Sequence, residues 1–430
     1  MATSSALRDF LTPGGSDEGA GSLPAIDRIL DAVRQHLGMD VAFASRYVDG
    51  RREFTNIRAA IPVPASPGDS EPQEDTACFR IVQGRLPELM HDAGQYPAAA
   101  ELAIVAALPV GAHLNVPLRL SDGTLYGSFC CLSQKPDATL TARDLDTMRA
   151  FAALAAGQIE RDLNDDRERS ERFDRISDVI ARDAIAIVYQ PIHALADGRP
   201  VGVESLSRFA DQHERTPDIW FDEAEKVGLG RQLELCAIRQ AIRGLCYIPS
   251  NLYVAVNVSP ETAISPELEA IVAAAPEGRL VIEVTEHSRE FDLDALRAAI
   301  TRLQRRARIA IDDVGAGYSG LRRILDLKPD ILKLDMSLTR DVDTDPARAA
   351  LAAAMVDFAE GIGARIVAEG IETPGERAAL HRLGVGYGQG WHFSRPMPAI
   401  AAQHFLLGAD IGEESSPSKA VARVSARGRA

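Results

Sequence analysis

The chain has 430 residues, of which 25% are charged and 46% hydrophobic, and its formal net charge is -15 at pH 7. This length allows two or three domains, and the negative charge argues against binding of nucleic-acid polymers or anionic membranes through overall charge. A polyanionic substrate would therefore need bound metal ions or a few well-placed cations.

The five cysteines show neither a C-x-x-C pair nor a spacing typical of zinc sites. We interpret them as packed thiols in a reducing compartment. The first residues contain no basic segment followed by an apolar core, and no uninterrupted apolar stretch reaches the length of a membrane span. We therefore expect a cytoplasmic protein that does not bind membranes.

The first part of the chain has the pattern of a small mixed domain. Residues 1–22 are rich in serine, glycine and other small residues, which predicts a flexible leader. Helical spacing of apolar residues follows from Pro24, and then come short β-like runs, two of which flank a turn at 121–123. The stretch after Pro136 predicts a long helix that becomes almost wholly charged. We predict a first domain over residues 23–165 and a charged helical linker over residues 166–176.

Short apolar β-rich runs alternate with amphipathic helical stretches over residues 177–408, which we predict to be a second domain. The candidate strands contain AIVYQPI, VGVESLS, LYVAVNVS, RLVIEVTE, ARIAIDDV, DILKLD, ARIVAEG and VGYGQGWHF. This alternation indicates an α/β fold whose parallel sheet closes into a TIM-like (β/α)8 barrel. Residues 409–430 have low complexity and predict a disordered tail.

Polar side chains end most of these candidate strands. They are Glu204, Asn257, Glu283, Asp312, Asp313, Lys333, Asp335 and Glu369. The carboxyl ends of barrel strands face one mouth, where catalytic groups lie, so these residues should meet in one pocket. A lone acidic residue at a strand end is more often a helix cap or a surface charge. Acidic or amide groups that recur at the corresponding ends of several strands instead favour a functional site.

Carboxylates held close together repel each other by several kcal/mol, which hard divalent cations relieve. Aspartate, glutamate and amide oxygens are the ligands that Mg²⁺ or Mn²⁺ prefers, and adjacent aspartates allow one carboxylate to bridge two ions. Two such ions about 3.5–4 Å apart stabilise in-line displacement at phosphorus. The pattern therefore predicts phosphodiester hydrolysis.

The stretch IAIDDVGAGYSG, residues 309–320, also contains the G-x-G-x-x-G spacing of dinucleotide-binding turns. Asp312 and Asp313 would then lie against a pyrophosphate, and no helix-forming residues follow the first glycine directly. We therefore reject an NAD-type oxidoreductase. We interpret the glycines as a turn that lets both aspartates reach metal ions.

The region from about residue 173 to 408 resembles an EAL domain, a bacterial phosphodiesterase that hydrolyses cyclic di-GMP to linear pGpG. The resemblance rests on ordered motifs, namely YQP, GVESLSR, NVS, EVTE, DDVGAGYSGL, KLD, AEGIET and GQGWHFSRP. It implies two Mg²⁺ or Mn²⁺ ions, the first bound by Glu204, Asn257, Glu283 and Asp312, and the second by Asp312, Asp313 and Glu369.

The same resemblance implies roles in catalysis and substrate binding. The catalytic residues would be Glu204 as a metal ligand, Lys333, which would orient or polarise the attacking water and the phosphate, and Glu369 as a candidate general base. Four further residues are implied by the motifs: Gln389 within the site, Gln190 and Arg208 as substrate contacts, and Glu286 as a brace for the loop after the paired aspartates.

The chain departs from the family pattern without losing a ligand. Ser205 replaces the central alanine of the signature, and the loop after the aspartates carries Val314, Ala316 and Gly320 where the family has Phe, Thr or Ser, and Ser. The intact ligand set favours an active phosphodiesterase. The altered loop leaves open a second hypothesis, a non-hydrolysing cyclic di-GMP receptor that acts through a protein partner.

Residues 23–165 resemble a GAF domain, a sensory module with a six-stranded antiparallel sheet and flanking helices. The resemblance rests on the opening and closing helices and on DVAFASRYVDGR, ACFRIVQGRLPELMHDA and NVPLRLSDGTLYGSFCCLS. It implies an α+β domain that regulates the phosphodiesterase and whose ligand is unknown, because such domains bind cyclic nucleotides, haem, bilins or nothing and the fold does not decide which. We interpret Cys78 as a packed cysteine, and the family implies a homodimer.

Overall fold

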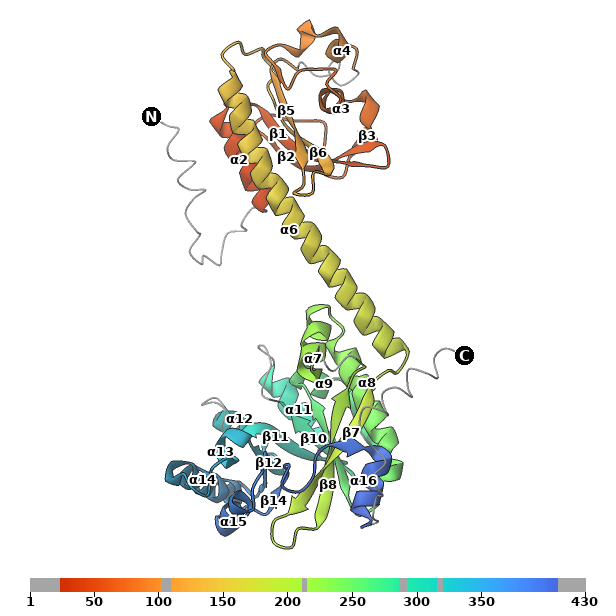
Figure 1. Ribbon diagram of the computed structural model, residues 1–430, viewed down its shortest axis with the longest axis vertical. Coiled ribbons are helices and arrows are strands. Elements are labelled where there is room, and N and C mark those ends of the chain that lie inside the picture. Colours follow the sequence, from red (N-terminus) through yellow and green to blue (C-terminus); the bar gives the residue numbers. More distant parts are fainter. Residues whose placement is uncertain (1–23, 103–109, 211–214, 286–291, 315–319, 409–430) are drawn as a thin grey trace. The chain divides into compact units, whose positions relative to one another are not determined.

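The computed structural model describes residues 24–102, 110–210, 215–285, 292–314 and 320–408, except the side chains of Ala100, Asp313 and residues 320–323. The chain divides into two compact units, Met1–Glu168 and Arg169–Ala430 (Figure 1). The predicted leader and tail lie outside the described residues. Within the described ranges, no helix combines the length and the apolar character needed to cross a membrane.

An antiparallel sheet forms the centre of the first unit, as predicted. Its strand order is β3-β2-β1-β6-β5-β4, and the strands are β1 (Val41–Val48), β2 (Arg51–Ala59), β3 (Ser70–Pro72), β4 (Leu89–Met90), β5 (His113–Arg119) and β6 (Leu125–Leu132). Asp49 and Gly50 join β1 to β2, and both have positive φ angles, 48° and 73°. This two-residue turn suits the right-handed twist of the hairpin, and aspartate followed by glycine is a sequence that adopts it.

Two long helices cover one face of this sheet. They are α2 (Ala25–His36) and the first part of α6 (Ala142–Ala181), which pack with strand residues such as Ala42, Leu114 and Cys131 in one apolar core. The shorter α3 (Ala77–Val82) packs on β5 and β6, and α4 (Pro97–Ala100) follows farther along the chain. Cys78 of α3 shares a second core with Phe43 and Cys130, which lie on the other face of the sheet.

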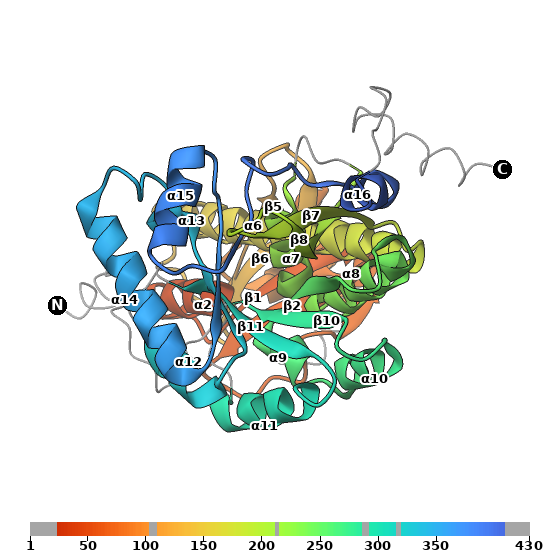
Figure 2. The ribbon, with the colours of Figure 1, turned by 90° about the horizontal axis from the view of Figure 1, so that it is seen from below.

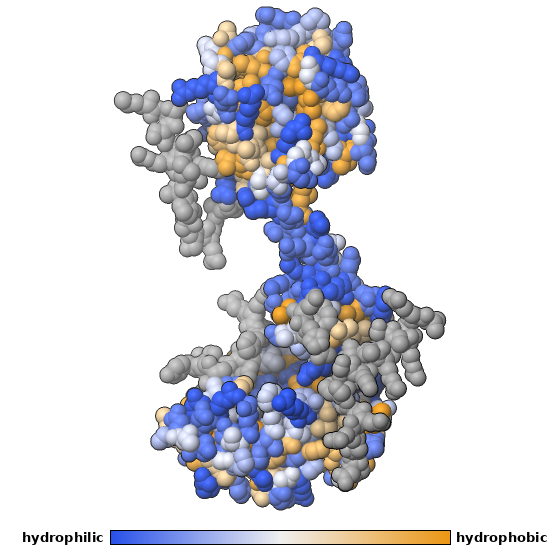
Figure 3. Space-filling model, in the orientation of Figure 1, coloured by the Kyte–Doolittle hydropathy of each residue, from blue (hydrophilic) through white to orange (hydrophobic). Residues whose placement is uncertain are grey.

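The predicted charged linker at residues 166–176 is part of α6, which is helical over all its 40 residues. Hydrophilic residues cover the middle of this helix (Figure 3). The loss of apolar periodicity in the sequence therefore reflects the exposure of this stretch of the helix. The predicted boundaries at residues 165 and 177 both lie inside α6 and stay predictions.

Eight strands close a barrel in the second unit, which confirms the predicted fold class. They are β7 (Ala186–Ala194), β8 (Pro200–Arg208), β9 (Tyr253–Val258), β10 (Leu280–Val284), β11 (Arg308–Val314), β12 (Ile331–Leu334), β13 (Arg365–Ala368) and β14 (Tyr387–Gly388). Each strand pairs with the next, and β14 pairs with β7 to complete the ring. A short ninth strand, β15 (Met397–Pro398), also pairs with β7.

One feature of the barrel differs from the parallel sheet that we expected. Strands β8 to β14 run parallel, but β7 runs antiparallel to both β8 and β14. A short turn joins β7 directly to β8, whereas a parallel pair needs a long crossover that is usually a helix. The strand–helix alternation therefore begins only after β8.

Helices surround the strands, as Figure 2 shows for α10, α11, α12, α14 and α15. Their bounds are α7 (Pro217–Lys226), α8 (Gly230–Arg243), α9 (Pro260–Ala263), α10 (Pro266–Ala274), α11 (Leu293–Leu303), α12 (Gly320–Leu327), α13 (Met336–Thr339), α14 (Pro346–Ile362), α15 (Pro374–Arg382) and α16 (Ala399–Leu406). Alternate strand residues such as Val256, Ile282 and Leu332 pack in the main core of this unit. The intervening residues form a smaller apolar cluster inside the barrel: Ile192, Tyr253, Ala255, Val281, Ala310, Ile331 and Val367.

Gly202 of β8 gives the Tyr253 ring the space that it occupies in this inner cluster. A Cβ atom at position 202 would lie 2.5–2.6 Å from three atoms of that ring. Real Cβ contacts are longer, so a side chain at this position would displace the ring or the strand. The close approach explains why the residue two before Glu204 has no side chain.

Gly202→Ala should lower the free energy of unfolding of the second unit by about 1–3 kcal/mol, because it overpacks the barrel interior. Both tryptophans of the chain, Trp220 and Trp391, lie in this unit, so tryptophan fluorescence during denaturant titration reports on it. The control is Gly361→Ala, since a Cβ at Gly361 meets nothing within 4 Å. Equal midpoints for the two variants would contradict this account of Gly202.

Candidate active site

A layer of polar side chains lies directly above the inner apolar cluster of the barrel. Its members each follow a residue of that cluster by two positions: Asn257 after Ala255, Glu283 after Val281, Asp312 after Ala310, Lys333 after Ile331 and Glu369 after Val367. Residues two apart in a strand share a face. The strands therefore present these side chains together near their carboxyl ends, as predicted from the positions of the strand ends.

Lys333 of β12 is at the centre of this layer and is only 1% exposed. Its Nζ atom lies near four carboxylates, at 2.7 Å from Glu369 Oε1, 2.9 Å from Glu283 Oε2, 3.1 Å from Asp312 Oδ1 and 3.6 Å from Glu204 Oε1. One ammonium group has three donors and one positive charge. The cluster therefore has more negative charge than Lys333 can balance when all four groups are ionised.

Two amide side chains hold Glu204. Asn257 donates from Nδ2 to Glu204 Oε1 at 3.1 Å. Gln389 donates from Nε2 to Glu204 Oε2 at 2.6 Å and to Glu369 Oε1 at 3.2 Å. The structure thus brings Gln389, which follows β14, into contact with Glu204 of β8 and with Glu369, which directly follows β13.

The charges in the cluster shift the pKa values of its members in opposite directions. Burial opposes ionisation of Glu204, but Lys333 and the hydrogen bonds from Gln389 and Asn257 outweigh it and lower the pKa of Glu204. Burial raises the pKa of Glu283 well above its ordinary value, and Lys333 offsets this only in part. Burial also raises the pKa of Glu369 to about 8.

For Lys333, attraction to the carboxylates outweighs the effect of burial on the pKa. Burial by itself favours the neutral amine, but attraction to the surrounding carboxylates is stronger and holds the pKa of Lys333 well above its ordinary value. The carboxylates therefore favour the charged form of Lys333, and burial favours protonation of Glu283 and Glu369. A further cation in this place would release those protons.

The paired aspartates coincide with an irregularity in the sheet. The register between β11 and β12 shifts between Ile311 and Val314, so that Asp312 and Asp313 lie opposite Lys333 alone. Such a bulge bends a strand and turns side chains away from strict alternation, and bulges are common beside active sites. Asp313 lies in β11, but its side chain is outside the described part of the chain.

Two of the remaining predicted residues, Gln190 and Arg208, lie on β7 and β8. Gln190 pairs with Glu204 across β7 and β8, and its Nε2 donates to the Ser394 carbonyl at 3.3 Å. Arg208 is half-buried at the carboxyl end of β8, where burial lowers its pKa. Glu286 lies outside the described residues. Asp335 is not part of the cluster, because its side chain caps α13 by accepting from Ser337 N at 2.9 Å.

Two residues support the site in ways that the sequence did not predict. Ser205, next to Glu204, donates from Oγ to the Ala255 carbonyl at 2.6 Å and so ties β8 to β9. Glu234 of α8 accepts from Ser259 N at 3.1 Å and from Ser259 Oγ at 2.9 Å, which holds the segment after Asn257. The unusual serine in the signature was a visible signal for the first, but nothing in the pattern marks Glu234 among other helical glutamates.

The fold and the cluster define a barrel with an acidic, buried site at its strand ends, and comparison of the sequence identifies the family. Residues 174–396 match the EAL domain and residues 23–159 match the GAF domain. The first match covers more than half of the chain. The chain therefore belongs to the EAL domain family and carries a GAF domain before the EAL domain.

Individual relatives agree with this assignment. The cyclic di-GMP phosphodiesterase NbdA of Pseudomonas aeruginosa is 33% identical over 237 residues, which are 52% of this chain and 30% of NbdA. An uncharacterized protein of Mycobacterium bovis, Mb1392c, is 32% identical over 274 residues, 58% of this chain and 88% of that protein. The chain spans only about a third of the length of some curated relatives that it matches.

One solved structure resembles the chain over both units. The EAL enzyme Bd1971 in its cGMP-bound form has a TM-score of 0.52 and 16% identity, and the match covers 86% of this chain and 93% of that one. At this identity the similarity concerns the fold alone.

Lys333→Met should destabilise the second unit by about 3 kcal/mol or more in the presence of a metal chelator, because it leaves the buried carboxylates without their cation. Denaturant titration followed by tryptophan fluorescence measures the loss, and added Mn²⁺ should restore part of it. The matched control is Lys226→Met, which removes an exposed pair with Asp222 and should cost at most about 1 kcal/mol. Similar losses for both variants would refute the central role of Lys333 in charge balance.

Proposed function

We propose that the second unit hydrolyses cyclic di-GMP to linear pGpG. The observation that carries this proposal is the ring of buried carboxylates around Lys333 at the strand ends of an EAL domain. The name of the Pseudomonas aeruginosa relative, a cyclic di-GMP phosphodiesterase, supports the same substrate. A site of this charge needs cations to accept a substrate with two phosphodiester anions.

The donor set fits two divalent metal ions. It offers carboxylate and amide oxygens, the hard ligands that Mg²⁺ and Mn²⁺ prefer, and Gln389 Oε1 is a buried acceptor without a donor among the described residues. We assign one ion to Glu204, Asn257, Glu283 and Asp312, and the second to Asp312, Asp313 and Glu369. When bound, such ions supply Lewis-acid activation of the phosphate and of the attacking water.

The side chains of the chain then orient the reaction and move its protons. Attack of water on one phosphorus breaks the P–O3′ bond, which leaves a 5′ phosphate and a 3′ hydroxyl in pGpG. Glu369 would take the proton of the water once bound cations have released its own proton, and would return it to the leaving O3′. Lys333 places a fixed positive charge beside the phosphate, and Gln389 aligns Glu204 with Glu369.

Substrate binding outside the metal site falls to one residue in the middle of β7 and one at the end of β8. Arg208 lies four residues beyond Glu204 on the same strand, and its guanidinium suits a phosphate or a guanine edge. Gln190 is the cross-strand neighbour of Glu204. We propose that these two side chains hold cyclic di-GMP while the metal ligands hold its scissile phosphate.

We further propose that the GAF domain regulates this activity through a bound small molecule, with residues 23–165 and 177–408 as the two functional domains. The continuous α6 helix supports this, because it begins in the first unit and ends just before β7. The homodimer expected from the family stays a prediction. Large apolar side chains are exposed on α6 at Leu154, Leu163 and Phe173, but their spacing does not repeat at three or four residues.

Glu204→Ala should lower the rate of pGpG formation by at least about 100-fold, because even residues that only support a metal ligand cost about 10–100-fold when they are lost. The assay incubates purified full-length protein with cyclic di-GMP and Mg²⁺ or Mn²⁺ and quantifies pGpG by chromatography. Glu269→Ala is the control, since Glu269 is exposed on α10 and pairs only with Arg302 among the contacts described.

The outcome also separates the enzyme from the receptor. Binding of cyclic di-GMP by the wild-type protein without any pGpG, at high protein concentration and with either metal, would favour the non-hydrolysing receptor. Turnover by Glu204→Ala at the wild-type rate would refute the assignment of the metal ligands.

A further inference from the structure

A second cluster of chemically active side chains lies in the first unit. Cys78, His113 and Cys130 are buried, with exposures of 2%, 4% and 0%. One possible ligand atom from each, the sulfur of both cysteines and a ring nitrogen of the histidine, lies within 4.8 Å of the others. None of these three residues takes part in the proposed phosphodiesterase chemistry.

The sheet pairing explains why residues far apart in the sequence meet here. His113 begins β5, and Asn115 lies two residues farther along the same strand, so both point to one face of the sheet. Cys130 of β6 lies directly opposite Asn115 and points to that face as well. Cys78 approaches that face from the first turn of α3. Cys131 is adjacent in sequence but points to the opposite face, where it packs with the core under α2 and α6.

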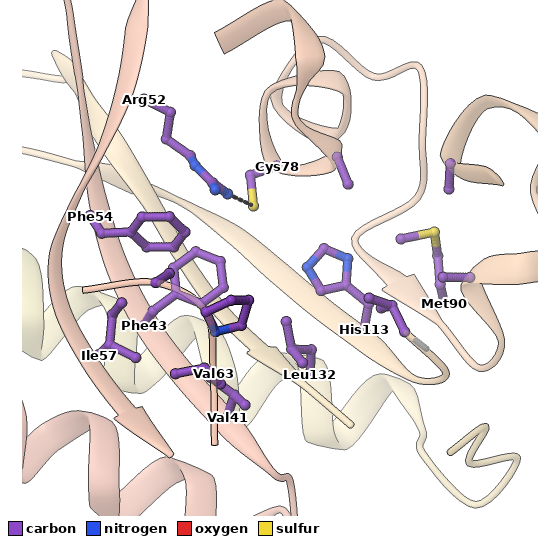
Figure 4. A pocket seen from close by; sticks show the side chains of 16 residues that line it. Val41, Phe43, Arg52, Phe54, Ile57, Val63, Cys78, Met90, His113 and Leu132 are labelled. Atoms are coloured by element: carbon purple, nitrogen blue, oxygen red, sulfur yellow. Dashed lines mark hydrogen bonds between the residues drawn. The ribbon is translucent and has the colours of Figure 1, made fainter. Parts of the chain in front are cut away.

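A cavity of about 100 Å³ adjoins the cluster (Figure 4). Cys78 and His113 line it, and Figure 4 shows both facing the same space. The rest of its wall is largely apolar, with Phe43, Phe54, Ile57, Val63 and Met90 among the lining residues. One side of the cluster is therefore accessible from an apolar cavity while the other is closed by the sheet.

The thiol groups of the two cysteines lie within hydrogen-bonding distance of each other. Their sulfur atoms are 3.1 Å apart, and Cys130 Sγ also donates to Asn115 Oδ1 at 2.6 Å. The hydrogen bond from Cys130 lowers the pKa of Cys78 well below its ordinary value, and His113 and Arg52 lower it further. Burial, together with Cys78, raises the pKa of Cys130. Thiolate is the form that binds metals and reacts.

Arg52 provides a positive charge beside this thiolate. Its Nη1 donates to Cys78 Sγ at 3.4 Å, the interaction drawn as a dashed line in Figure 4. Arg52 is 5% exposed, and its Nε atom has no hydrogen-bond partner among the described residues. Glu71 pairs with the same guanidinium. The charge of Arg52 is thus already balanced, and the pair of cysteines requires a separate cation if both sulfur atoms are to be ionised.

We propose that Cys78, Cys130 and His113 bind one thiophilic transition-metal ion of the Zn²⁺ class, with a fourth coordination position that faces the apolar cavity. Two thiolates and a neutral imidazole give a dication a net charge of zero, which suits a buried site. Three protein ligands with one open position are typical of zinc sites that exchange a small ligand. Binding displaces the protons that remain on the two thiols, because thiolates are the ligands.

The geometry is close to that of a bound site. With Zn–S bonds of about 2.3 Å and Zn–N bonds of about 2.0 Å, the ligand atoms of a tetrahedral site lie about 3.5–3.8 Å apart. The two sulfur atoms would therefore separate by roughly 0.6 Å from their hydrogen-bonded distance. Soft sulfur and imidazole ligands also distinguish this site from the all-oxygen site of the second unit, which prefers hard ions.

Titration of reduced, full-length protein with Co²⁺ tests the proposal. Co²⁺ at a cysteine ligand gives an intense thiolate-to-metal charge-transfer band, which oxygen ligands of the second unit do not produce. We expect this band to saturate at one equivalent per chain and to disappear when Zn²⁺ displaces Co²⁺. Absence of this band in the reduced protein would overturn the proposal. It would do so even if the two cysteines form a disulfide once reductant is removed.

Variants locate the ligands. Cys78→Ser and His113→Gln should each abolish the band or lower Co²⁺ affinity at least about 10-fold. Cys131→Ser, the adjacent buried cysteine on the other face, should leave it unchanged. If Cys131→Ser abolished the band while Cys78→Ser and His113→Gln retained it, the metal would be bound at another site and the proposal would be overturned.

A measurement without variants covers the case in which a substitution prevents folding. X-ray absorption spectroscopy of wild-type protein loaded with one equivalent of Zn²⁺ identifies the neighbouring atoms. Two sulfur neighbours and at least one nitrogen support the site. A shell of oxygen and nitrogen alone overturns it.

Discussion

The second unit depends on how one buried ammonium group is shared among four carboxylates. Lys333 lies within 3.6 Å of Glu204, Glu283, Asp312 and Glu369, and the charges do not balance when all four are ionised. Burial, together with the neighbouring carboxylates, raises the pKa values of Glu283 and Glu369. A barrel that retains such a cluster loses stability relative to an apolar interior, which marks the cluster as a candidate functional site.

The barrel produces this cluster by placing polar residues two positions beyond an apolar layer. Tyr253, Ala255 and Val281 fill the interior, and Gly202 gives the tyrosine ring its space. The next inward-facing residue on successive strands is then a carboxylate, an amide or the ammonium group of Lys333. The apolar layer closes the site from one side, which lowers the local dielectric constant and strengthens each electrostatic contact above it. The same arrangement leaves the carboxyl ends of the strands as the side from which substrate arrives.

The sequence was sufficient to predict the barrel and most of the site, because parallel strands bring their ends together whatever their exact register. It did not predict that β7 runs antiparallel, since its pattern matches that of a parallel strand. It also did not predict contacts that depend on tertiary packing, such as Glu234 with Ser259 or Ser205 with Ala255. The cluster of Cys78, His113 and Cys130 was missed for the same reason, because strand pairing brings together residues whose spacing resembles no zinc motif.

We thus propose two metal sites of opposite chemical character, a hard oxygen site in the EAL domain and a soft sulfur and nitrogen site in the GAF domain. The central claim concerns the first, and Mn²⁺ binding followed by electron paramagnetic resonance tests it most directly. The account predicts that the signal of free aqueous Mn²⁺ stays suppressed until about two equivalents per chain have been added, and that bound ions show magnetic coupling. A free Mn²⁺ signal that grows from the first addition would contradict it.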